Sequence, residues 1–101
     1  MGSSVGLFSK YKEYSDILIE TGTYTGNGVE CAFNSGYTTV YSCDVNSEYV
    51  LNAKEKFKDK NFIVELIPSE IALKKFLNEI DERCVIFLDG HAMPYDMNAP
   101  N

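Results

Sequence analysis

Short apolar runs alternate with helix-spaced apolar residues along this chain. Four runs are rich in β-branched and aromatic residues, which is typical of β-strands. The predicted strands cover residues 17–20, 38–44, 62–66 and 84–88. The last run, C-V-I-F-L, has no polar position, as expected of a strand buried on both faces of a parallel sheet.

Apolar residues outside these runs recur every three to four positions, which indicates amphipathic helices. A short lead helix is expected to end near Asp16, with Val5, Leu7, Phe8, Tyr11 and Tyr14 as its apolar residues. Three more helices should follow the first three strands. Their predicted apolar faces are Val29, Ala32 and Phe33; then Tyr49 or Val50, Ala53 and Phe57; then Ile71, Leu73, Phe76, Leu77 and Ile80.

Residues that cap helices or break regular structure complete the prediction. Gly36 should adopt a left-handed conformation after the first of these helices, Asn46 or Ser47 should cap the second, and Ser69 the third. Residues 92–101 include prolines and asparagines without periodicity, so they are predicted to be a loop or a disordered tail.

Strands that alternate with helices predict an α/β fold. With a reversal at the first strand, we expect a parallel Rossmann-like sheet of order 3-2-1-4 with helices on both faces. Gly22, Asp44, Ser69 and Asp89 each follow a different predicted strand. They should therefore meet at the carboxyl edge of the sheet, where ligands of open α/β folds bind.

The turn after the first strand carries the main candidate chemistry. Residues 20–26 read E-T-G-T-Y-T-G, and glycines there let a ligand approach the main chain. The spacing differs from the dinucleotide fingerprint, and no lysine follows as in a phosphate-binding loop. A carboxylate beside the turn suits a ligand with a cationic amino group, so a nicotinamide enzyme is a remote alternative. A second acid, Asp44, follows 22 residues after Gly22, where it can accept ribose hydroxyls.

This turn resembles motif I of the class I S-adenosylmethionine-dependent methyltransferases, most closely the small-molecule O-methyltransferases. The resemblance covers residues 17–91. It implies a cofactor site built from Glu20, Gly22, Tyr24, Gly26, Asp44 and Ser69.

Each of these residues also has a purely structural interpretation. Glu20 and Asp44 could cap backbone amides, and the glycines could simply form a tight turn. Tyr24 could be a core aromatic residue. At Ser69 the chain reads I-P-S where related enzymes have G-D-S or G-D-A with an acid that contacts adenine, so Ser69 could serve only as a helix cap.

Two residues after the fourth strand are candidates for catalysis. The resemblance implies that Asp89 could bind Mg²⁺, which would lower the pKa of a substrate hydroxyl. The other metal ligands of the family come from a following strand that is not predicted here, so the site would be incomplete. His91 is similar to a histidine of macrocin-type sugar O-methyltransferases and could act as a general base. It could equally be a polar loop residue.

Length and charge limit the function classes. The chain has 101 residues and a formal charge of −6, so nucleic acid is not expected as a partner. Cys31, Cys43 and Cys84 show no pairing pattern, which favours reduced thiols in a cytoplasmic protein. No apolar run is long enough to span a membrane, and no signal peptide is predicted.

The predicted fold is short for this family, whose sheets have seven strands. The domain prediction is a cofactor-binding half domain over residues 1–91 and a tail over 92–101. An uncovered fourth strand would favour a homodimer or other oligomer, unless the chain is a fragment of a longer enzyme. The predicted function is methyl transfer to an oxygen atom of a small molecule. The alternative is a non-catalytic nucleoside-binding or oligomerising module derived from a methyltransferase.

Overall fold

The computed structural model describes residues 8–88 and 91–96. The elements in chain order are β1 (Ile17–Thr21), α2 (Asn27–Asn34), β2 (Thr39–Cys43), α3 (Ser47–Lys56), β3 (Asn61–Glu65), α4 (Ser69–Glu79), β4 (Cys84–Leu88) and β5 (His91–Tyr95). A helical turn at residues 8–11 precedes them. The predicted lead helix is therefore too long at its carboxyl end, because residues 12–16 form turns and a bend.

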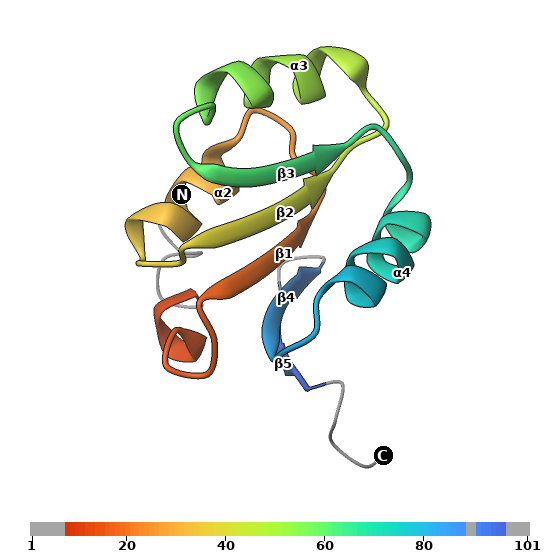
Figure 1. Ribbon diagram of the computed structural model, residues 1–101. Helices are drawn as coiled ribbons and strands as arrows, with labels where there is room; N and C mark the ends of the chain where they lie inside the picture. The colour runs from red at the N-terminus through yellow and green to blue at the C-terminus, as the bar shows by residue number, and fades with distance from the viewer. Residues whose placement is uncertain (1–7, 89–90, 97–101) are drawn as a thin grey trace.

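One five-stranded sheet organises these elements, in the order β3-β2-β1-β4-β5 (Figure 1). The pairs β1–β2, β1–β4 and β2–β3 are parallel, which confirms the α/β class and the predicted order of the first four strands. The chain reverses direction across the sheet at β1, since β2 lies on one side of it and β4 on the other.

The fifth strand corrects the sequence prediction. β5 pairs antiparallel with β4, from Cys84 opposite Tyr95 to Leu88 opposite His91. The interpretation of residues 92–95 as a loop or tail is wrong, because an edge strand tolerates Pro94 without an alternating pattern. Residues 97–101 lie outside the described residues. Since β5 covers β4, the free β4 edge that motivated a dimer is absent, and the oligomeric state stays a prediction.

Side chains alternate between two faces of the sheet, and each face packs on different helices. On one face, Leu18 and Val40 lie in a cluster with Val29 of α2 and Ala53 of α3. On the other face, Ile19 and Cys43 pack with residues of α4, chiefly Ala72 and Phe76. Figure 1 shows α4 on its own side of the sheet, so the prediction of helices on both faces is confirmed. Ile71, predicted to be buried, is 53% exposed.

The helix ends follow from local hydrogen bonding. Gly36 has φ 103°, and the amides of Gly36 and Tyr37 donate to Phe33 and Ala32, respectively. These are the two bonds of a Schellman motif, as expected for glycine at this position. Ser69 does not cap α4, since it is the first helical residue and Pro68 occupies the cap position.

Asn46 caps α3, and its side-chain oxygen accepts from the amides of Glu48 at 2.9 Å and Tyr49 at 3.2 Å. We expect Asn46→Ala to lower the free energy of unfolding by about 1 kcal/mol, because these two amides lose their acceptor. Urea denaturation measures the change. Asn52→Ala, at an exposed position within α3, is the matched control and should not destabilise the protein.

Candidate functional site

The glycine turn is tied to the end of β2 by buried hydrogen bonds. The amides of Gly22 and Thr23 both donate to the Cys43 carbonyl at 3.0 Å. Thr23 is 2% exposed, and its hydroxyl lies 2.7 Å from the Ser42 hydroxyl. These bonds hold the turn beside the carboxyl end of β2, so the backbone of Gly22 faces the space between the β1 and β2 loops.

Asp44 joins the two loops at this edge. Its Oδ2 atom accepts from the Tyr24 amide at 3.0 Å, and its Oδ1 atom accepts from the Asn46 amide at 2.9 Å. Asp44 is therefore not the N-cap of α3, a role that belongs to Asn46. Each carboxylate oxygen keeps a second lone pair that can accept from a ligand hydroxyl.

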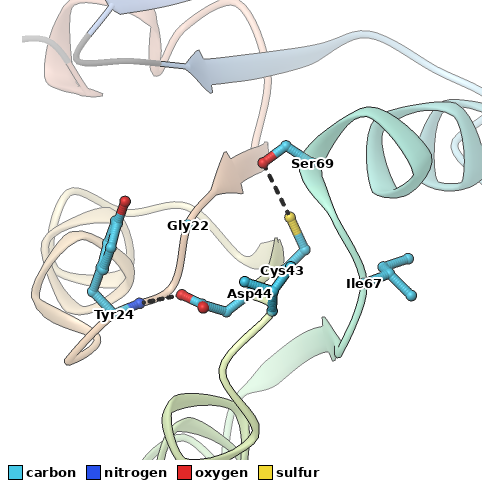
Figure 2. A pocket seen from close by; sticks show the side chains of 7 residues that line it. Gly22, Tyr24, Cys43, Asp44, Ile67 and Ser69 are labelled. Carbon is cyan, nitrogen blue, oxygen red and sulfur yellow. Dashed lines mark hydrogen bonds between the residues drawn. The ribbon is translucent and has the colours of Figure 1, made fainter.

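Four of the predicted cofactor residues lie around a single cavity of ≈ 180 Å³: Gly22, Tyr24, Asp44 and Ser69. Figure 2 shows Tyr24 and Ser69 on opposite sides of Asp44 and Cys43. We call this space the loop-end cavity. It is lined by Gly22, Tyr24, Cys43, Asp44, Val45, Ile67 and Ser69.

Tyr24 is a wall of this cavity and not a core residue. Its side chain is 65% exposed, and its ring meets that of Tyr49 edge to face, with centroids 6.0 Å apart. A Cβ atom on Gly22 would lie 2.8 Å from Cε2 of the Tyr24 ring. Glycine at position 22, with φ 90°, therefore leaves room for the ring as well as for the turn.

Ser69 stands at the opposite wall. Its hydroxyl is 3.9 Å from the Cys43 sulfur, a weak contact that Figure 2 marks. Burial raises the pKa of the Cys43 thiol and outweighs its hydrogen bonds with Gly22 and Ser69, which lower that pKa. Cys43 is thus a neutral floor of the cavity, and the Ser69 hydroxyl is free to donate to or accept from a ligand.

Glu20 and Gly26 are placed outside the loop-end cavity. By strand alternation Glu20 lies on the α2 side of β1, the same face as Ser42 on β2. Its side chain is 6% exposed, and a Cβ atom on Gly28 would lie 1.9 Å from its Oε2 atom. Gly26, with φ 90°, starts α2 and packs against the Phe57 ring. Their cofactor roles stay predictions.

Burial of Glu20 changes its chemistry. Desolvation raises the pKa of this carboxyl group from 4.5 to about 8. Its Oε1 atom is buried and has no hydrogen-bond partner among the described residues. The group is therefore largely protonated at neutral pH, and a nearby ligand cation would favour its ionised form.

The candidates for catalysis are less defined. Asp89 lies outside the described residues. His91 begins β5 opposite Leu88, and its side chain is outside the described part as well. Within residues 8–88 and 91–96, no group of three potential metal ligands was found. No described helix has the length and apolar character required to cross a membrane.

Sequence reasoning missed Cys43, Val45 and Ile67 as cavity residues. Val45 and Ile67 each follow a strand at the carboxyl edge, so their positions in the chain were the available signal. Val45 is 72% exposed where it lines this cavity.

Comparison with known proteins supports the fold. The chain is similar to the crystal structure of an rRNA methylase from Streptococcus thermophilus, with a TM-score of 0.56 and 14% sequence identity. The match covers 84% of this chain and 68% of that one. No family model matches the sequence, and no curated protein does. The chain therefore shares the Rossmann-like α/β fold of that protein. The comparison does not support the narrower likeness to small-molecule O-methyltransferases.

Proposed function

We propose that this chain binds S-adenosylmethionine in the loop-end cavity and forms the cofactor-binding part of a methyltransferase. The observation that carries this proposal is the convergence of Gly22, Asp44 and Ser69 on one cavity, since each follows a different parallel strand. The cavity lies beside β1, where the strand order reverses, the position at which open α/β sheets bind ligands.

The lining residues suit the parts of a nucleoside. The ribose hydroxyls would donate to the Asp44 carboxylate, which is already oriented by the Tyr24 and Asn46 amides. The apolar side chains of Val45 and Ile67 would contact the base, and Ser69 supplies one neutral hydrogen-bonding group. The methionine part would extend along the turn from Gly22 toward Glu20.

The cofactor would supply a methyl group already activated by its positive sulfur. The chain's own residues then act by positioning, which is the main contribution to such a transfer. Asp89 and His91 remain the proposed sources of acid–base help at the acceptor. A complete Mg²⁺ site is not part of this proposal, because the described residues do not supply its ligands.

We further propose that the acceptor is a small molecule methylated on oxygen. The similar solved structure is described as an rRNA methylase, so RNA is the competing acceptor. The charge of −6 opposes RNA, because phosphate backbones are attracted to basic surfaces.

A second candidate is a nucleoside-binding module without catalysis. It is favoured by the cavity lining, in which no side chain is a free general base. Asp44 already accepts two backbone amides, and burial raises the pKa of Cys43, which keeps this thiol protonated.

Calorimetric titration tests the proposal. S-adenosylmethionine and its demethylated product, S-adenosylhomocysteine, should bind in the micromolar range, equivalent to roughly 8 kcal/mol. NAD should not bind, since the turn lacks a pyrophosphate loop. Failure of both sulfur ligands to bind would refute the cofactor assignment. Binding without methylation of any hydroxylated acceptor would favour the module.

A further inference from the structure

The loop-end cavity has two chemically different ends. Gly22 and Tyr24, from the connection after β1, form one end, which we call the turn end. Ile67 and Ser69, from the connection after β3 and the start of α4, form the other, which we call the α4 end. Figure 2 shows Ser69 on the far side of Asp44 from Tyr24. The Asp44 carboxylate therefore lies between the two ends.

A ribose held by Asp44 places the base at the α4 end. In a nucleoside, the base and the chain that carries the sulfur leave the sugar on either side of its ring oxygen, away from the two hydroxyls. The proposed function directs the sulfur chain along the turn from Gly22. The base then extends in the opposite direction, toward Ile67 and Ser69.

Of the two residues at the α4 end, only Ser69 has a polar side chain. Both oxygens of Asp44 already accept from backbone amides, and they face the ribose in the proposed complex. Burial raises the pKa of the Cys43 thiol, so this group is neutral and a weak hydrogen-bonding partner. In the part of the chain that the structure describes, the Ser69 hydroxyl makes one contact, at 3.9 Å from the Cys43 sulfur. The hydroxyl is therefore available to the edge of a base.

A serine hydroxyl does not distinguish a donor from an acceptor. It donates one hydrogen bond and accepts others, and it rotates to suit its partner. Adenine has an amino donor at position six, whereas its deaminated form, hypoxanthine, has a carbonyl acceptor there. A fixed donor or a fixed acceptor in the cavity would favour one of these bases, because the other base would leave a polar group unpaired.

We propose that Ser69 contacts position six of the bound purine and that the loop-end cavity accepts adenine and hypoxanthine nucleosides alike. This inference rests on the proposed function, because it names the bases that the same cavity accepts. The site recognises the ribose through Asp44 and the flat face of the base through apolar contact. Ser69 is the residue that makes it tolerant of the purine's identity.

Three thioethers that differ only at the base test the proposal by calorimetric titration. S-adenosylhomocysteine carries adenine, S-inosylhomocysteine carries hypoxanthine, and S-ribosylhomocysteine has no base. The first two should bind with dissociation constants within about threefold of each other, because one hydrogen bond to Ser69 replaces another. S-ribosylhomocysteine should bind at least about tenfold more weakly, because it buries no base against the apolar lining.

Variants at position 69 separate contact with the base from a structural role. Ser69→Ala should weaken S-adenosylhomocysteine and S-inosylhomocysteine by the same factor of about five, because both lose one neutral hydrogen bond. Ser69→Thr keeps the hydroxyl and should restore both affinities. Glu70→Gln, at the exposed next position, is the matched control and should change neither affinity.

Several results would overturn the inference. A preference of more than about threefold for either purine would show that the cavity reads position six. Unchanged affinities in Ser69→Ala would show that this hydroxyl does not contact the base. Equal binding of S-ribosylhomocysteine would place the base outside the cavity. In each of these cases S-adenosylhomocysteine still binds and the cofactor site stands, whereas the proposed function fails first if S-adenosylhomocysteine does not bind.

Discussion

Glu20→Gln should raise the free energy of unfolding at pH 8 by up to about 4 kcal/mol, because the native state then no longer buries a carboxylate. Burial raises the pKa of Glu20 from 4.5 to about 8 in the folded chain. Between these values the folded state holds a proton that the unfolded state has released. The stability contributed by this proton is complete below pH 4.5 and is lost as the pH rises through about 8.

Urea denaturation of the wild type and of Glu20→Gln from pH 4 to pH 9 measures how the free energy of unfolding depends on the ionisation of Glu20. The wild type should lose stability across that range relative to Glu20→Gln, and the two curves should converge near pH 4. Glu82→Gln, at an exposed position, is the control and should change stability by less than about 0.5 kcal/mol. Parallel curves for wild type and Glu20→Gln would show that Glu20 ionises normally in the folded chain.

Asp44→Ala should cost stability and ligand affinity together. Removing the carboxylate leaves the Tyr24 and Asn46 amides without an acceptor. Hydrogen bonds to a charged group contribute about 1.5–3 kcal/mol each, so we expect a loss of roughly 3 kcal/mol in the free energy of unfolding. The affinity for S-adenosylhomocysteine should fall by roughly 1–3 kcal/mol, because the ribose hydroxyls also lose their acceptor.

Calorimetric titration at a temperature below the midpoint of thermal unfolding separates the loss of ligand affinity from the loss of stability. Asp44→Asn keeps the size of the side chain and one acceptor oxygen, so it should fold better than Asp44→Ala and still bind the ligand weakly. Asp59→Asn, an exposed acid in the turn before β3, should leave the affinity unchanged. An Asp44→Asn variant that binds as tightly as the wild type would remove Asp44 from the site.

The parallel part of the sheet was predictable because burial on both faces produces continuous apolar runs. The run at residues 84–88 matches β4 at both ends. β1 ends one residue later than predicted, and β2 and β3 each differ from the prediction by one residue at both ends. The order 3-2-1-4 followed from the rule that crossovers are right-handed and the reversal lies at the ligand crevice.

β5 was not predictable by the same reasoning. Its sequence, H-A-M-P-Y, has no alternating pattern and contains a proline, which usually argues against a strand. Its pairing depends on the neighbouring strand β4 and on the tolerance of a sheet edge for a residue without an amide hydrogen. Local propensity does not contain that information.

Some residues of the candidate site were predictable from the sequence and others were not. Gly22, Asp44 and Ser69 were predictable as neighbours, because the carboxyl ends of parallel strands share one edge. The role of Gly28 was not predictable, because the absence of a side chain at this position makes room for the Glu20 carboxyl group and not for a ligand. That contact depends on how α2 lies across β1, so neither the burial of Glu20 nor its raised pKa follows from the turn sequence.

The central claim is that the loop-end cavity is a nucleoside site, and amide chemical shifts measured during a titration with S-adenosylhomocysteine test it most directly. The account predicts that the amides of Gly22, Tyr24, Val45 and Ser69 shift together along one binding curve, while those of the opposite sheet edge, such as Ser15 and Arg83, stay in place. Saturable shifts confined to the opposite edge, or none at millimolar ligand, would contradict it.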